Sequence, residues 1–322
     1  MKKLRSIQTL RAIAALLVLF YHLSDGGFIA GGSGVDIFFL ISGFIMGTVG
    51  TRETPRVFLT RRLIRIAPLY WLMTLAMCLA SLTGLLANFS FDLYRLTLSF
   101  LFVPYADADG HIWPLFVPGW TLNLEMLFYA VFAVALLTPR PLAVASLLLC
   151  ILVALGLHDW QAAPMIQWTT PMLLEFVLGL GVSRFRHILR PGAALPLFVL
   201  SILLLAASAF LTVDPTPYRV VIWGLPACAL LASCLSLEEA GRWPQRWLAP
   251  LERLGDASYS LYLTHGIVLA AIFKFLPMGI LTTLVAVSLA LVVAQLSYML
   301  LERPINRFAS TLRWAKMPAA RT

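Results

Sequence analysis

The sequence predicts an all-α integral membrane protein, a bundle of about ten transmembrane helices with both termini in the cytoplasm. Three observations predict this class. Of the 322 residues, 60% are hydrophobic and only 12% are charged, whereas soluble domains carry about 25% charged residues. Apolar runs close to the roughly 20 residues that a bilayer requires fill most of the chain. The basic residues gather between alternate apolar runs, as the positive-inside rule expects.

Each predicted span corresponds to one apolar run. The first run follows basic residues, as in a signal peptide, but no small-residue cleavage site follows it, so an uncleaved first helix is predicted. The apolar segment 94–104 is too short to cross and is interpreted as an interfacial or re-entrant piece of a long outer loop. The predicted spans are 7–24, 34–50, 68–87, 119–138, 142–158, 169–185, 195–212, 219–236, 258–276 and 280–300.

The distribution of basic residues sets the orientation of these spans. With the N-terminus inside, 21 of the 24 lysines and arginines fall on the cytoplasmic side, and only Arg95, Arg219 and Lys274 fall outside. Such a split favours ten spans with both ends inside. The net charge of +9 could suggest that the protein binds nucleic acid. The distribution argues against this, because the basic residues lie between spans instead of forming a patch. The four cysteines all lie in apolar runs, without the spacing of a metal site, and no metal is expected.

Three ionisable residues are predicted at one depth near the outer face. His22 ends the first span, Asp36 begins the second and Glu125 lies near the start of the fourth. Ionisable groups inside a membrane are costly and indicate function. An imidazole beside a carboxylate is a general-base arrangement, in which the carboxylate orients the ring. Structural alternatives exist for each: a dipole-stabilising acid for Asp36, an interfacial aromatic for His22 and an interhelical hydrogen bond for Glu125.

Arginines near the inner face suggest an anionic ligand. Arg11 and His22 lie eleven residues apart, on one helix face and about 16 Å apart along the axis. This spacing suits a long donor such as acyl-CoA, with phosphates at the inner end and a thioester at the outer end. In the predicted loop before the third span, Arg62 and Arg65 share a helical face and suit phosphate. The alternatives are a positive-inside anchor for Arg11 and a headgroup-binding stretch for the pair.

The outer loop and the ninth span hold further candidates. Aromatic and acidic residues between 104 and 120, including Trp113 and Trp120, could bind a sugar by stacking and hydrogen bonding, although an aromatic belt is the alternative. His265 lies in the middle of the ninth span, where a purely structural role is the alternative.

The chain also resembles the acyltransferase 3 family of membrane acyltransferases, especially its exopolysaccharide O-acetyltransferase branch. The resemblance runs in order along essentially the whole chain. It rests on Ser6–Ala12 continuing to Tyr21-His22, on Gly34–Phe39 with Ser42–Phe44, on Arg62–Ile66 with Pro68 and Tyr70, on Pro118–Glu125 with Phe128-Tyr129, on Gly255–His265, and on Glu302–Pro304.

The resemblance implies an enzyme that takes acyl groups from cytoplasmic acyl-CoA and places them on extracytoplasmic or lipid-linked carbohydrate in the cell (inner) membrane. The family's patterns map onto Arg11 with His22 and onto Arg62 with Arg65. We therefore expect His22, Asp36 and Glu125 to be catalytic and the three arginines to bind the acetyl-CoA or other acyl-CoA donor. Trp120, Trp113, Tyr259 and His265 are expected to bind the carbohydrate acceptor.

One transmembrane acyltransferase domain over 1–310 and a basic cytoplasmic tail over 311–322 are expected. The alternative function is a proton-coupled transporter or flippase of carbohydrate-type substrates, because membrane histidines and carboxylates also build proton relays. The inverted repeats that such transporters often show are not found in this sequence.

Overall fold

A computed structural model describes residues 4–83, 89–107, 109–211 and 215–311. Within these ranges every regular element is helical, which confirms the predicted fold class. Of the predicted tail at 311–322, residues 312–322 lie outside the described residues. The α-helices are α1 (Arg5–Leu23), α2 (Ser33–Val49), α3 (Pro55–Leu82), α4 (Leu93–Phe100), α5 (Gly119–Ala135), α6 (Pro141–Leu155), α7 (Ala163–Trp168), α8 (Leu173–Phe185), α9 (Pro191–Ala207), α10 (Leu225–Glu239), α11 (Gln245–Asp256), α12 (Ser258–Phe275), α13 (Ile280–Ser297) and α14 (Arg303–Thr311).

A helix occupies the place of each predicted span, and seven helical segments in the described ranges are long and apolar enough to cross a membrane. The count of ten stays a prediction, because α5 and α6 are apolar but have only 17 and 15 residues, and α12 is not among the seven. The predicted third span starts at 68, inside a longer helix. Helix α3 begins at Pro55, so Arg62 and Arg65 lie on the helix and not in a loop before it. Proline at the first helical position is preorganised to start a helix there.

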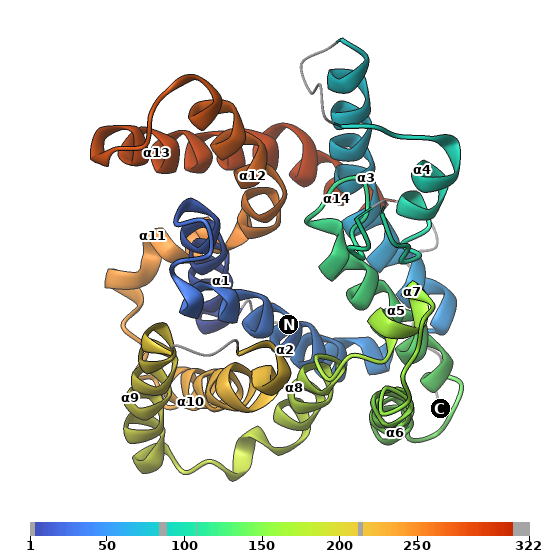
Figure 1. Ribbon diagram of the computed structural model, residues 1–322. Helices are drawn as coiled ribbons and strands as arrows, with labels where there is room; N and C mark the ends of the chain where they lie inside the picture. The colour runs from blue at the N-terminus through green and yellow to red at the C-terminus, as the bar shows by residue number, and fades with distance from the viewer. Residues whose placement is uncertain (1–3, 84–88, 108, 212–214, 312–322) are drawn as a thin grey trace. The chain divides into compact units, whose positions relative to one another are not determined.

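The chain forms two compact units, one from Met1–Val49 with Leu174–Met299 and one from Gly50–Leu173 with Leu300–Thr322. In the first unit, α1 packs against α2, α10, α11 and α12, so its residues meet most of that unit (Figure 1). Helix α13 packs on α12 through a stripe of buried small residues, Ala286, Ala290 and Ala294. Small side chains let membrane helices approach closely, which is the main source of packing energy inside lipid.

The start of α1 is fixed by an acidic residue from α10. Glu238 accepts hydrogen bonds from the backbone N–H groups of Arg5 and Ser6 at 2.9 and 2.8 Å and from the Ser6 hydroxyl at 2.5 Å. The first N–H groups of a helix have no partner within the helix and carry partial positive charge. A carboxylate supplied by another helix therefore both caps α1 and fixes it against α10.

In the second unit, α5 packs against α3, α6 and α7, and α14 packs against α3. Gly119, at the start of α5, lies directly against the Tyr70 ring: a Cβ built on it would lie 2.5 Å from a ring carbon. Tyr70 in turn packs against Phe102, in the segment after α4, with the ring centroids 5.1 Å apart. Only glycine permits this approach, so the beginning of α5 is positioned against α3.

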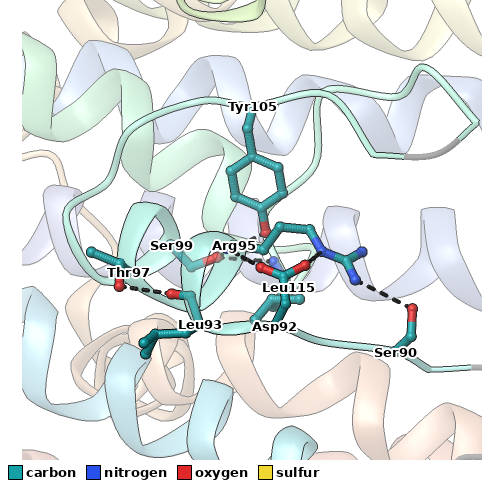
Figure 2. Close-up of polar contacts among 8 residues, drawn as sticks. All are labelled: Ser90, Asp92, Leu93, Arg95, Thr97, Ser99, Tyr105 and Leu115. Carbon is teal, nitrogen blue, oxygen red and sulfur yellow. Dashed lines mark hydrogen bonds and ion pairs between the residues drawn. The ribbon is translucent and has the colours of Figure 1, made fainter.

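Short-range hydrogen bonds hold α4 and the segment that follows it (Figure 2). Asp92 caps α4 by accepting from the Arg95 N–H at 2.7 Å and from the Arg95 Nε at 2.7 Å. These two hydrogen bonds to the charged form hold the pKa of Asp92 below its ordinary value. Ser99 bonds the Tyr105 hydroxyl at 2.9 Å and accepts from the Leu115 N–H at 3.2 Å. Arg95, predicted to lie outside, thus serves a local structural role.

Candidate active site

The clearest site in the first unit is a pair of histidines. His22 lies in the last turn of α1 and is exposed, whereas His265 on α12 is only 2% exposed. Their ring centroids lie 5.2 Å apart with a 38° angle between the planes. Tyr21 meets the His22 ring edge-on, also at 5.2 Å. The two helices that pack side by side thus bring together an accessible imidazole and a buried one.

Hydrogen bonding fixes the tautomer of the buried histidine. His265 Nδ1 lies 3.1 Å from the Leu261 carbonyl oxygen, one turn earlier on α12. A carbonyl oxygen only accepts hydrogen bonds, so Nδ1 carries the proton. In the neutral ring that suits a buried position, Nε2 is then an acceptor.

Asp36 is completely buried at the start of α2 and pairs with Arg219 rather than with a histidine. Arg219 donates from Nε to Oδ1 at 3.0 Å and from Nη2 to Oδ2 at 2.8 Å, a bidentate arrangement. The same Nη2 donates to the Gly32 carbonyl at 2.8 Å. Among the described residues of this unit, no carboxylate forms an ion pair with His22. Both carboxylate oxygens of Asp36 therefore accept hydrogen bonds from the Arg219 guanidinium.

Two more side chains complete this buried group. Glu175 on α8 is 0% exposed and interacts electrostatically with both Asp36 and Arg219. Trp223 lies under the Arg219 guanidinium at 4.8 Å and donates from its indole nitrogen to Ser208 at 2.9 Å. A second buried carboxyl group thus lies near the Asp36–Arg219 pair, and burial of two carboxyl groups near one guanidinium disfavours ionisation of both.

In the second unit, Arg62 is largely buried on α3. It lies over the Phe58 ring at 5.4 Å and reaches Glu53 with Nη2 at 3.5 Å, and Arg61 forms a shorter ion pair with the same carboxylate. The Arg62 Nε–H is buried without a hydrogen-bond acceptor among the described residues. A buried guanidinium N–H is costly to leave unpaired, so this atom can donate to an acceptor oxygen that enters the site.

Glu125 lies in the second unit, where Tyr129, one turn later on α5, donates a hydrogen bond to its Oε1. Tyr129 is buried and interacts electrostatically with Arg62 and Arg65 as well. The tyrosine therefore links the predicted catalytic carboxylate with the predicted donor-binding arginines. Arg11 lies on α1 in the first unit and is half-buried.

The predicted acceptor-binding residues are spread over several elements. Trp113 is 43% exposed and stacks on His111, with centroids 4.3 Å apart and planes 6° apart. Asp107 holds this segment by accepting from the His111 N–H at 2.8 Å. Trp120, at the start of α5, is half-buried, and its carbonyl accepts from the Gln167 amide at 2.7 Å. Tyr259 is half-buried in the first turn of α12.

Acidic groups in the segment between α4 and α5 also approach one another. Asp107, Asp109 and His111 offer ligand atoms within 4.8 Å of one another. Exposed acidic groups of this kind occur on many loops without a metal.

Sequence reasoning missed Arg219, Tyr129 and the pairing of His22 with His265. One signal for Arg219 was available, because it is one of only three cationic residues predicted outside, and a cation there suggests a buried partner. Tyr129 is one of the positions on which the family resemblance rests, but no role was predicted for it, since a tyrosine in a span is ordinarily a packing residue. His22 and His265 are 243 residues apart in the sequence. The predicted depth of each residue in the membrane does not reveal that they are in contact.

Comparison with known proteins gives a consistent result. A family model described as an acyltransferase domain matches residues 4–301. The exopolysaccharide production protein ExoZ of Rhizobium meliloti (strain 1021) is 39% identical over 305 residues, covering 90% of this chain and 95% of that protein. BcsY of Komagataeibacter xylinus, named for membrane-bound transacylase activity, is 30% identical over 93% of this chain and 82% of its own length.

A more distant relative is the peptidoglycan O-acetyltransferase OatA of Listeria monocytogenes serovar 1/2a (strain ATCC BAA-679 / EGD-e). It is 26% identical over 95% of this chain and 56% of its own length. No solved structure matches this chain.

Proposed function

The chain belongs to the membrane acyltransferase family defined by this domain, and on that premise we propose that it moves an acetyl group from cytoplasmic acetyl-CoA to a carbohydrate hydroxyl. The acceptor is a surface polysaccharide or exopolysaccharide, or its lipid-linked precursor, and the enzyme acts in the cell (inner) membrane. The names of the relatives support this acceptor class, since one relative serves exopolysaccharide production and another is an O-acetyltransferase. The observation that carries the proposal is the exposed imidazole of His22, in a chain that matches the family from residue 4 to residue 301.

His22 acts as the general base in this proposal. A neutral imidazole takes the proton of the acceptor hydroxyl while its oxygen attacks the thioester carbonyl. The C–O bond forms, the C–S bond breaks, and the departing thiolate receives the proton from the imidazolium. The exposure of His22 supports this role, because a large acceptor must reach the base. Asp36 and Glu125 were the predicted carboxylate partners; the contacts of Asp36 favour a structural role for it, and Glu125 stays a candidate.

Transfer is direct in this proposal, from donor to acceptor in a ternary complex. A covalent acyl-enzyme would require a nucleophile beside His22, and Ser24 is the nearest serine in sequence. Its hydroxyl donates to the Tyr21 carbonyl at 3.0 Å and accepts from the Phe28 N–H at 2.8 Å, so it is used to hold the turn after α1. Ser42 is the other serine that sequence leaves open.

Arg62 and Arg65 bind phosphate groups of the donor in this proposal. The unsatisfied Nε–H of Arg62 supports it, since phosphate oxygens accept hydrogen bonds from guanidinium groups in bidentate fashion. The burial of Arg62 also fits an enclosed ligand better than a lipid headgroup on the surface. Arg11 is assigned to the donor by its position in the sequence pattern alone.

Exposed aromatic rings bind the acceptor in this proposal. The Trp113–His111 stack offers a flat exposed face, and the adjacent carboxylates of Asp107 and Asp109 can accept hydrogen bonds from sugar hydroxyls. Trp120 and Tyr259 are proposed to contribute from the starts of α5 and α12.

The direct test of the function measures thiol release by the purified protein in detergent or nanodiscs. Acetyl-CoA is supplied with and without a polysaccharide fraction from the source cells. We expect release that depends on the polysaccharide and an acetyl ester on the recovered sugar. Counterflow of a labelled oligosaccharide in proteoliposomes, with no ester formed, would favour the transporter instead.

The donor assignment is tested by Arg62→Ala, with Arg56→Ala as the matched control on the same helix. Arg56 is exposed on α3 and holds no proposed role. We expect Arg62→Ala to raise the KM for acetyl-CoA about 10- to 100-fold, as loss of hydrogen bonds to a charged group predicts. The KM for the acceptor should be unchanged, and Arg56→Ala should behave as wild type. An unchanged donor KM in folded Arg62→Ala would refute the assignment.

A further inference from the structure

Among the described residues of its own unit, no carboxylate forms an ion pair with His22, but a second imidazole lies beside it. Asp36, the carboxylate at matching depth, gives both oxygens to Arg219. The ring against His22 is instead that of His265, 5.2 Å away between centroids. Tyr262 is the other aromatic neighbour of His265, at 6.0 Å. A general base that gains a proton needs an acceptor for its second N–H, and the neighbouring group that offers one is an imidazole.

The tautomer of His265 suits this task. Its Nδ1–H is held by the Leu261 carbonyl at 3.1 Å, so its Nε2 lone pair remains available. His265 is 2% exposed, so water competes poorly for that lone pair, while His22 is open to a substrate. The helical hydrogen bond also fixes the ring orientation, as a positioning residue requires.

We propose that His265 is a positioning residue for the acetyl transfer: its Nε2 accepts the second N–H of His22, orients that ring and supports the imidazolium. This inference rests on the proposed function, in which His22 is the base. It assigns His265 a role different from the acceptor binding that the sequence predicted. Because the supporting group is neutral, His22 returns its proton to the leaving thiolate more readily than it would beside a carboxylate.

Two substitutions separate this role from a packing role. Glutamine places its side-chain oxygen near the position of Nε2, whereas asparagine reaches only the position of Nδ1. We expect His265→Asn to lower kcat about 10- to 100-fold, the loss of one hydrogen bond to a charged group, with the KM of donor and acceptor unchanged. His265→Gln should recover most of kcat. Thr264→Val is the control, because the Thr264 hydroxyl is buried on α12 and donates to the Ser260 carbonyl of its own helix at 2.8 Å.

Each result has one meaning, provided that the variants elute as folded protein on size exclusion. Wild-type kcat in His265→Asn overturns the proposal, and so does an equal loss in the asparagine and glutamine variants. A raised acceptor KM with unchanged kcat overturns it in favour of acceptor binding. Failure of the underlying function looks different: the wild-type protein then forms no ester, or His22→Ala retains full turnover.

Discussion

At the scale of single residues, the role of the buried Asp36 carboxylate follows from the cation with which it pairs. Asp36 is fully buried and bonded by Arg219 through two oxygens, and Glu175 lies beside the same guanidinium. Removing one partner from a buried ion pair leaves an uncompensated charge, which costs more than the pair itself contributes. The group therefore joins α2 to the segment before α10, and its stability is linked to its charge balance.

This view predicts that Asp36→Asn destabilises the protein by about 3–5 kcal/mol, the usual cost of breaking a buried pair. Glu175→Gln should be far milder, because no ion pair of Glu175 occurs among the described residues and an amide is nearly isosteric with a carboxyl group. Thermal unfolding in detergent, followed by tryptophan fluorescence, measures both. A stable but inactive Asp36→Asn protein would contradict the structural role and restore Asp36 as the catalytic carboxylate.

Residue chemistry was predictable from the sequence, but residue pairing was not. The depth of a residue along a predicted span follows from counting residues. This depth identified His22, Asp36 and Glu125 as candidate catalytic residues. Depth does not say which way a side chain points around its helix or which helix lies next to it. The contacts of Asp36 with Arg219 and of His22 with His265 depend on that missing information.

At the scale of helices, glycine permits one very close crossing in the first unit. A Cβ on Gly43 of α2 would lie 2.3 Å from the Phe176 carbonyl oxygen, and one on Gly179 of α8 would lie 2.2 Å from the Leu40 carbonyl oxygen. Both obstacles are backbone atoms, which cannot move aside as a side chain can. Close backbone approach through small residues is the usual way that membrane helices pack.

Gly179→Ala should therefore destabilise the protein by about 1–3 kcal/mol through overpacking. Gly181→Ala is the matched control, two residues along the same helix, because nothing lies within 4 Å of its Cβ position. That control should be neutral or slightly stabilising, since alanine is the better helix former. Thermal unfolding of the two purified variants decides the matter, and equal midpoints would show that α2 and α8 do not cross as described.

Helix existence was predictable, whereas helix boundaries were not. Apolar runs gave the place of each span, because burial in lipid demands them. Helix α3 begins at Pro55, whereas the predicted span begins at 68. The difference arises because the first turns of the helix carry arginines, which lower the mean hydropathy of that segment. Those arginines remain helical because Arg62 is paired with Glu53 and covered by Phe58, contacts that composition does not reveal.

At the scale of the whole molecule, charge sets the orientation in the membrane. With 21 of 24 basic residues on one side of the predicted spans, reporter fusions after Arg190 should report from the cytoplasm. Fusions at Ala108, which lies outside the described residues, should report from the opposite side. Paired phosphatase and fluorescent-protein reporters read the two locations. Reversed signals at both sites would be incompatible with ten spans and cytoplasmic ends.

The central claim is that His22 is the base that transfers an acetyl group to carbohydrate, and one comparison tests it most directly. Purified wild-type and His22→Ala proteins are given acetyl-CoA and the polysaccharide acceptor, and acetyl ester formation is measured beside equilibrium binding of acetyl-CoA. We expect His22→Ala to bind the donor normally and to form ester about 10²–10⁴-fold more slowly, the usual contribution of a positioned base. Ester formation at the wild-type rate by folded His22→Ala would contradict the claim.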